Sequence, residues 1–242
     1  ISIGTDFEYL NDFYLGINNS NFYEVIETNS TASAQQQAQE GNYWDSFLKF
    51  NFNYDKRNQK FQTSDGFKSF YSLDLPIISD TNTIKNYYNY SHYFDFFEKN
   101  FSSISIYLQS ANSLNNKDIK LSERINIPSS RLRGFEAGRV GPKDGDDFVG
   151  GNYSYSINFA SNIPQLFEES QSIDFLIFAD AADIWGVDYN SSIDGEGIRS
   201  SIGVALDWMT PIGPMSFSFA HPITKKDGDV TETFRFNLGT TF

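Results

Sequence analysis

Apolar and polar residues alternate with a period of two along much of the chain. In the clearest segment, Leu48, Phe50, Phe52 and Tyr54 alternate with Lys49, Asn51, Asn53 and Asp55. In a strand, successive side chains point to opposite faces, so this pattern predicts a β-strand with one apolar and one polar face. Shorter alternations recur to the end of the chain, where Phe234, Phe236 and Leu238 alternate with Arg235, Asn237 and Gly239.

The pattern predicts about eleven strands of roughly ten residues, the length that a tilted strand needs to cross a bilayer. The expected segments are 1–10, 13–25, 48–55, 66–75, 85–97, 102–111, 153–160, 174–185, 201–208, 215–220 and 234–242. Residues 28–40 are rich in Ser, Thr, Ala and Gln, and predict a polar loop with at most a short helix. The fold class is therefore all-β.

Periodicity alone does not say which face of the strands meets water. In a soluble sandwich the apolar faces fill the core, whereas in a transmembrane barrel they face lipid and the polar faces line a wet interior. Loop lengths favour the barrel, because the connections near 28–44, 112–150 and 187–197 are long, while Asn11-Asp12 and 211–214 are short. Long loops at one rim and short turns at the other are typical of outer-membrane barrels, although the connection at 55–66 is of intermediate length.

Composition narrows the classes of function. The chain of 242 residues has a net charge of −13, which argues against nucleic acid as a partner. It contains 24 Phe and 14 Tyr, an excess that favours strands. It has no Cys, which excludes disulfides and thiolate metal sites. No apolar run approaches the length of a membrane helix, and the mean hydropathy of −0.43 is compatible with a barrel whose strands alternate.

The segment 131–142 interrupts the alternation with arginines and with Gly134, Gly138 and Gly141. This composition suits a strand interior poorly. One interpretation is a solvated surface loop. The other is a loop folded back into an enclosed space, where Arg133 pairs with a carboxylate.

Many separated motifs in the second half resemble one family. They are Leu132-Arg133-Gly134-Phe135, Val140-Gly141-Pro142, Gly150-Gly151-Asn152, Ala179-Asp180, Ile184-Trp185, Ile198-Arg199-Ser200-Ser201-Ile202-Gly203, Trp208-Met209-Thr210-Pro211-Ile212-Gly213-Pro214 and Phe234-Arg235-Phe236-Asn237-Leu238-Gly239, ending in Phe242. In this order they resemble the C-terminal part of the barrel of BamA-type outer-membrane protein assembly factors, the bacterial surface antigen family.

The resemblance implies a transmembrane antiparallel barrel of sixteen strands, of which this chain would hold about the last eleven. Residues 1–242 would form one partial barrel domain, without the early strands and the POTRA modules. The first and last strands would then run in the same direction, so we expect an open barrel.

The resemblance also implies roles for individual residues. The loop motif Arg133, Gly134 and Phe135 would enter the lumen, with Arg133 held by the positions of Asp180 and Asn158. At Asn158 the family has an acid, so this position would offer only an amide acceptor. Gly239 would let the last strand bend away from a lateral seam, and Phe242 would be part of a terminal export signal.

The function implied is the folding and insertion of β-barrel proteins in the Gram-negative bacterial outer membrane, by templating of client strands at the seam. The partners implied are the lipid bilayer, unfolded outer-membrane clients, assembly lipoproteins and periplasmic chaperones, with no nucleic acid, no cofactor and no metal. Two alternatives remain: a family relative that secretes a protein, and a plain porin-like barrel.

An enzyme is not expected. The only histidines are His92, on the lipid-facing phase of its strand, and His221, expected at a strand end. No nucleophile elbow or metal-ligand spacing occurs, so no catalytic residue is assigned. The run Asp144-Gly145-Asp146-Asp147 could hold a divalent cation but is interpreted as an ordinary loop.

Overall fold

The computed structural model describes residues 1–242 except 81, 165–171, 195–196, 212 and 240–242. Eleven strands form one sheet. Their bounds are β1 Ser2–Leu10, β2 Phe13–Ile26, β3 Gly41–Asp55, β4 Gly66–Ser79, β5 Thr83–Phe94, β6 Ser102–Ser113, β9 Tyr153–Asn162, β10 Ile173–Trp185, β11 Arg199–Thr210, β12 Gly213–Thr224 and β13 Phe234–Leu238. The helix α1 (Ala34–Gln37) lies in the 28–40 segment, and the short strands β7 (Lys143–Asp144) and β8 (Asp147–Phe148) pair with each other outside the large sheet.

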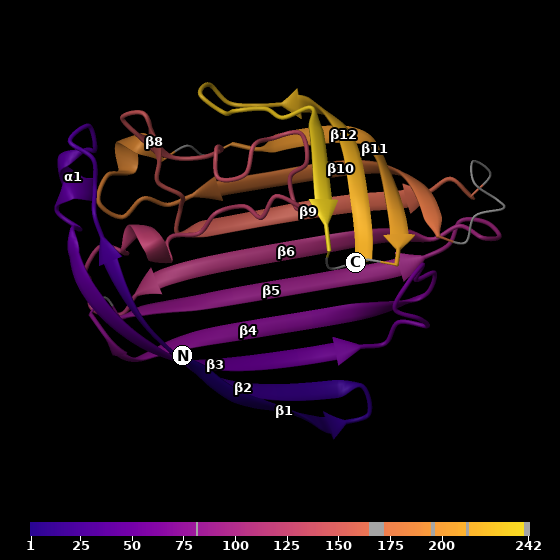
Figure 1. The fold of residues 1–242 in the computed structure, drawn as a ribbon, viewed down its shortest axis with the longest axis horizontal. Coiled ribbons are helices and arrows are strands. Elements are labelled where there is room, and N and C mark those ends of the chain that lie inside the picture. The colour runs from indigo at the N-terminus through magenta and orange to yellow at the C-terminus, as the bar shows by residue number, and fades with distance from the viewer. Residues whose placement is uncertain (81, 165–171, 195–196, 212, 240–242) are drawn as a thin grey trace.

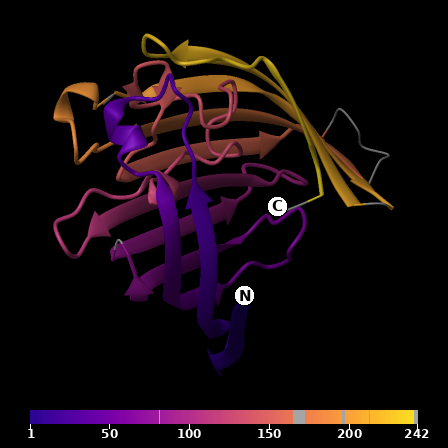
Figure 2. The ribbon, with the colours of Figure 1, turned by 60° about the vertical axis from the view of Figure 1, so that its left-hand side comes forward.

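The large sheet is antiparallel throughout, and its strands follow one another in chain order. It curves around the segment between β6 and β9 (Figures 1 and 2). β1 and β13 lie at its two edges, run in the same direction and are not hydrogen-bonded to each other. The predicted all-β fold with an open antiparallel barrel is thus confirmed.

Several strand bounds differ from those expected. β3 begins at Gly41, because residues 41–47 pair with β2 through their backbone although their side chains do not alternate strictly between apolar and polar. β5 ends at Phe94, three residues early. β12 runs past His221 through Pro222, which is tolerated because the register shifts at this point, between Ser200 and Ser201 of β11.

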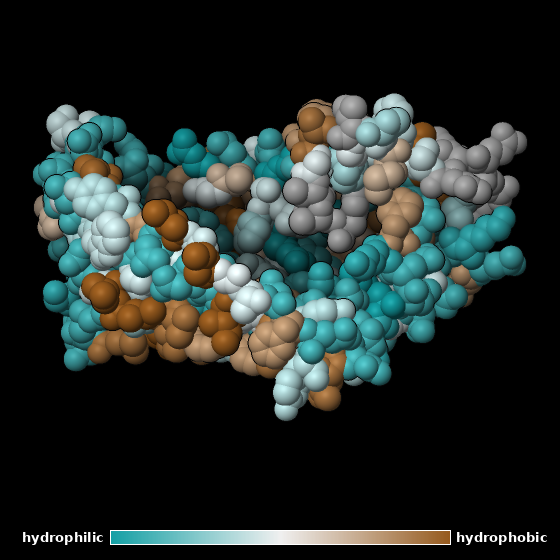
Figure 3. Space-filling view, turned by 60° about the horizontal axis from the view of Figure 1, so that its bottom comes forward, coloured by the Kyte–Doolittle hydropathy of each residue, from teal (hydrophilic) through white to brown (hydrophobic). Residues whose placement is uncertain are grey.

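Burial of the strand residues is the reverse of that in a soluble protein. Many side chains that point to the inside of the curved sheet are polar and buried; they include Ser91, Ser105, Ser154, Ser156, Asn158, Asp180, Ser201 and Ser218. Apolar side chains that point outward are exposed; they include Ile104, Ile106, Leu108, Ile157, Ile177, Ile202, Phe219, Phe234 and Phe236. Figure 3 shows apolar side chains along one outer edge and hydrophilic ones in the hollow. This arrangement fits a sheet whose outer face meets lipid, since a band of apolar residues in water would be unfavourable.

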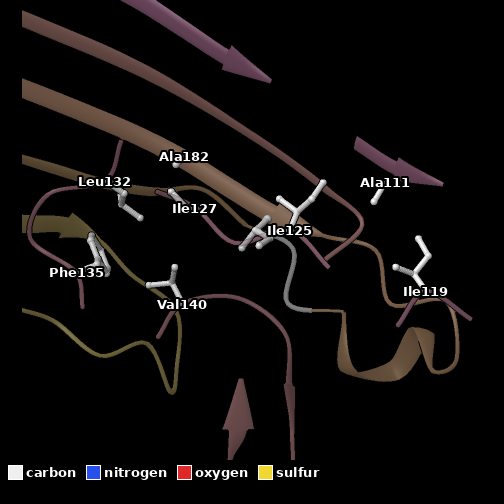
Figure 4. Close-up of a cluster of buried hydrophobic side chains, with 9 residues drawn as sticks. Ala111, Ile119, Ile125, Ile127, Leu132, Phe135, Val140 and Ala182 are labelled. Atoms are coloured by element: carbon white, nitrogen blue, oxygen red, sulfur yellow. The ribbon is translucent and has the colours of Figure 1, made fainter. Parts of the chain in front are cut away.

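The main apolar core lies inside the curved sheet and is built largely by the loop between β6 and β9 (Figure 4). Ile119, Ile125, Ile127, Leu132, Phe135 and Val140 of the loop pack against Ala111 of β6 and against Ala182 and Ile184 of β10. The predicted long loop folded into the lumen is therefore present, and hydrophobic burial holds it there.

Phe217 and Phe236 do not contribute to this core. Their rings face each other across β12 and β13 with centroids 5.0 Å apart, and Phe236 is 45% exposed. Among the described residues, no helix is long and apolar enough to span a membrane.

Candidate functional site

The loop segment around Arg133 is clasped by three inward-facing side chains that lie side by side on β9, β10 and β11. The strand register aligns Asn158 with Asp180, and Asp180 with Ser201. Each has a different partner on the loop, so together they fix the loop backbone as well as the arginine.

Arg133 forms a bidentate ion pair with Asp180. Its Nε and Nη2 donate to the two carboxylate oxygens at 2.7 and 2.8 Å, and its backbone N–H donates to Oδ2 at 3.1 Å. The carboxylate side chain is fully buried, and the arginine side chain is 18% exposed. The guanidinium carbon lies 3.4 Å from the ring centroid of Phe178, the next inward residue on β10. The fork geometry and the ring both favour arginine over lysine at this position.

Asn158 contacts the loop, but as a hydrogen-bond donor and not as the expected acceptor for Arg133. Its amide donates to Oδ1 of Asp180 at 2.8 Å and to the backbone carbonyl of Arg131 at 2.8 Å. An amide, unlike a carboxylate, can donate to a neighbouring acid, so Asn158 links Asp180 to the loop backbone instead of competing for the arginine.

The backbone next to Arg133 requires glycine. Gly134 has φ 90°, and a Cβ there would lie 3.2 Å from the Cβ atoms of Ser201 and Ala220. Ser201 Oγ donates to the carbonyl of Arg133, so the loop is within hydrogen-bond reach of β11. Phe135 follows with 1% exposure and forms an isolated antiparallel bridge with Thr231.

The first part of the loop is tethered to the opposite wall, a contact that sequence reasoning missed. Lys120 is buried, and its Nζ lies 2.5 Å from Asp45 Oδ2 of β3 and also contacts Glu24 of β2. Burial acts to lower the pKa of Lys120, but the hydrogen bonds to Asp45 and Glu24 outweigh it, and the pKa lies above its ordinary value. The only signal in the sequence was the position of the lysine between Ile119 and Leu121.

Two further buried arginines, also not predicted, connect the loops of one rim. Arg124 pairs with Asp188 of the β10–β11 connection and donates to Asn152 Oδ1 at 3.1 Å. Arg199 at the start of β11 contacts Asp183 at 2.9 Å and Asp229 at 3.0 Å. Their partners lie 16 to 64 residues away in the sequence, and Asp188 and Asp229 lie in loops, so only the folded structure identifies them.

The predicted residue Gly239 lies at the far edge of the sheet. Gly239 has φ 65° and directly follows the last residue of β13, and its N–H donates to the carbonyl of Pro214 at 2.8 Å. The extended strand therefore stops where the left-handed conformation begins. Phe242 lies outside the described residues.

The residues with possible chemistry are dispersed. His92 and His221 are both exposed on the outer face. Asp144 and Asp147 belong to the β7–β8 hairpin, where Asp144 accepts hydrogen bonds from Ser33 and Tyr189 at 2.5 and 3.1 Å. In the part of the chain that the structure describes, no three His, Cys, Asp or Glu side chains are grouped as metal ligands. The arrangement is suited to holding a loop and presenting a sheet edge.

Comparisons with known proteins agree with this geometry. A family model described as the Omp85 superfamily domain matches residues 2–242. The outer membrane protein assembly factor BamA of Neisseria meningitidis is 36% identical over 140 residues, which are 46% of this chain and 17% of that protein. A SAM50-like protein of Schizosaccharomyces pombe is 29% identical over 152 residues, which are 58% of this chain and 31% of that protein.

A solved structure of Haemophilus ducreyi BamA lacking POTRA domains 1–3 superposes with a TM-score of 0.81 at 26% identity. The match covers 97% of this chain and 52% of that one. The chain thus spans about half the length of this solved relative and less than a third of the two curated proteins just described.

Proposed function

Because this chain belongs to the Omp85 superfamily, we propose that it is the barrel part of an outer-membrane protein assembly factor. In this proposal it folds and inserts β-barrel proteins by pairing their strands with its own sheet edge at a lateral seam. The observation that carries the proposal is the combination of a loop anchored inside the lumen with a short edge strand, β13. An anchored loop suits a scaffold, and an edge strand suits templating.

The edge of β13 has the chemistry that templating requires. Backbone N–H and C=O groups on the free edge of a sheet have no hydrogen-bond partner in lipid, and each missing hydrogen bond costs roughly several kcal/mol of free energy. An incoming strand would satisfy them by β-augmentation. β13 is five residues long, the shortest of the eleven strands, so it offers a small contact that a client can later leave.

The setting is the bacterial outer membrane, in agreement with the family, with the bacterial relatives and with the exposed apolar face. We propose lipid, unfolded outer-membrane proteins, assembly lipoproteins and periplasmic chaperones as partners. Residues 1–242 act in this proposal as one partial barrel domain. Gly239 ends the template strand, and the Arg133–Asp180 pair keeps the loop from leaving the lumen.

The test uses the full-length protein that carries this chain, reconstituted in liposomes with an unfolded eight-stranded outer-membrane protein as client. Protease-resistant, folded client is measured over time against empty liposomes. We expect faster folding with the protein than without it, and loss of this gain when Gly239→Val stiffens the strand end. A client that folds equally fast in empty liposomes would refute the proposal, and steady ion conductance without any gain in folding would identify a pore.

A further inference from the structure

Arg235 is the one charged side chain of the edge strand β13, and it points into the lumen opposite Ser218 of β12. Its side chain is 11% exposed although its strand neighbours Phe234 and Phe236 are about half exposed. A buried guanidinium needs acceptors for its donors. The structure provides them from the lumen loop.

The contacts of Arg235 join the edge strand to both ends of the Arg133 segment. Nη1 donates to the carbonyl of Ser129 at 2.5 Å, and Nη2 donates to the carbonyl of Phe135 at 2.5 Å. Nε donates to Glu232 Oε2 at 2.8 Å, which keeps the guanidinium in place. The two carbonyls lie six residues apart on the loop, so a single planar group spans the segment that Asp180 holds from the other side.

The chain leading into β13 is also hydrogen-bonded to the loop along its backbone. Val230 accepts from Glu136 N–H at 2.9 Å and donates to the carbonyl of Arg139 at 3.0 Å. Glu232 N–H donates to the carbonyl of Gly134 at 3.1 Å. The loop therefore has a short antiparallel ladder with the residues just before the edge strand.

The geometry points to Arg235 as a latch that couples the edge strand to the lumen loop. While the loop is held by Asp180, Arg235 keeps β13 against β12, and release of the loop frees the strand to move. This inference rests on the proposed function, because it concerns what controls the exposure of the edge strand β13 to a client strand. Arg235 is a positioning residue, since it acts through the loop and the strand and need not touch a client.

Coupling is tested by hydrogen exchange of the full-length protein in lipid nanodiscs without any client. Arg133→Ala releases the loop, and we expect it to raise exchange of the β13 amides at least about tenfold, the factor for losing a charge-assisted hydrogen bond. In the Arg235→Gln background β13 exchanges faster from the start, and Arg133→Ala should add less than about twofold. If Arg235 only stabilised β13 locally, the two substitutions would act independently, and their effects on the exchange rates of the β13 amides would multiply.

Two further variants complete the design. Arg235→Lys should restore part of the coupling, because an ammonium can reach one of the two carbonyls. Arg139→Gln is the matched control on the same loop, because the side chain of Arg139 is 53% exposed. This substitution should leave amide exchange of both the loop and β13 unchanged. If Arg133→Ala does not fold, Arg133→Lys loosens the bidentate pair more mildly and is measured in the same way.

The inference is overturned if loop release leaves β13 protected while Arg235 is present, or if the two substitutions multiply. The result is independent of client folding. A protein that shows the coupling but does not accelerate folding would refute the proposed function alone, whereas one that accelerates folding without the coupling would refute the latch alone.

Discussion

Replacing Arg133 by alanine would remove the main partner of a carboxylate that has no contact with solvent. Asp180 would lose two hydrogen bonds, of 2.7 and 2.8 Å, and keep only the amide of Asn158 and the backbone N–H of residue 133. Breaking a buried ion pair on one side costs about 3–5 kcal/mol. Since two donors remain, we expect a loss of stability near the lower limit, about 3 kcal/mol.

The lost contact with the Phe178 ring adds a smaller amount, about 0.5–2 kcal/mol. The measurement is guanidinium unfolding of the full-length protein in detergent micelles, with the free energy taken from the midpoint and slope. Arg139→Ala is the control on the same loop, because its pair with Glu136 is half exposed on both sides and is worth about 1 kcal/mol or less.

A second variant separates the ion pair from loop packing. Substituting Arg133 by Met together with Asp180 by Leu removes both charges and keeps apolar volume, so it should recover most of the stability lost by Arg133→Ala. The reasoning would be refuted if Arg133→Ala were no more harmful than Arg139→Ala. It would equally fail if the double substitution were as destabilising as Arg133→Ala.

Three further predictions follow from the faces, the loop and the tether. Ile106→Lys places a charge on the outer face, where Ile106 is 40% exposed, and should destabilise the protein in bilayers by about 2–4 kcal/mol in urea unfolding; no effect would mean that this face meets water. Gly141→Ala should lower the Tm, because φ is 101° and the new Cβ would lie 2.5 Å from Ile184 Cγ2, and an unchanged Tm would show that the loop can shift. The folded-state pKa of Lys120 is raised, so its tether to Asp45 is complete below about pH 10.4 and is lost as pH rises through the higher folded value; protease cleavage of the loop should be constant from pH 7 to 9, and cleavage that rises already at pH 8 would contradict this.

The strands and their two faces were readable from the sequence. Alternation at positions such as Phe50 and Ile106 is a local property, and the pleat converts it directly into two faces. The strand ends were predicted less accurately, as at Gly41 and Phe94, because backbone pairing continues or stops without regard to side-chain polarity. Arg133 stood out because arginine and glycine together suit neither face of a strand.

The lumen contacts depended on distances that no local pattern contains. Asn158, Asp180 and Ser201 share a row only because the strand register aligns them, and this register made Asn158 a donor toward Asp180. In the sequence, Lys120 and Arg235 do not differ from ordinary polar residues. In the structure, the loop places Lys120 next to Asp45, and Arg235 donates to carbonyl groups of the loop.

The order of residues was enough to predict amphipathic strands and a loop unsuited to them. Which partners the buried charges find depends on the folded chain. The physical reason is that amphipathicity follows from the alternation of neighbouring residues, whereas the stability of a buried charge depends on groups brought within hydrogen-bond distance from tens of residues away.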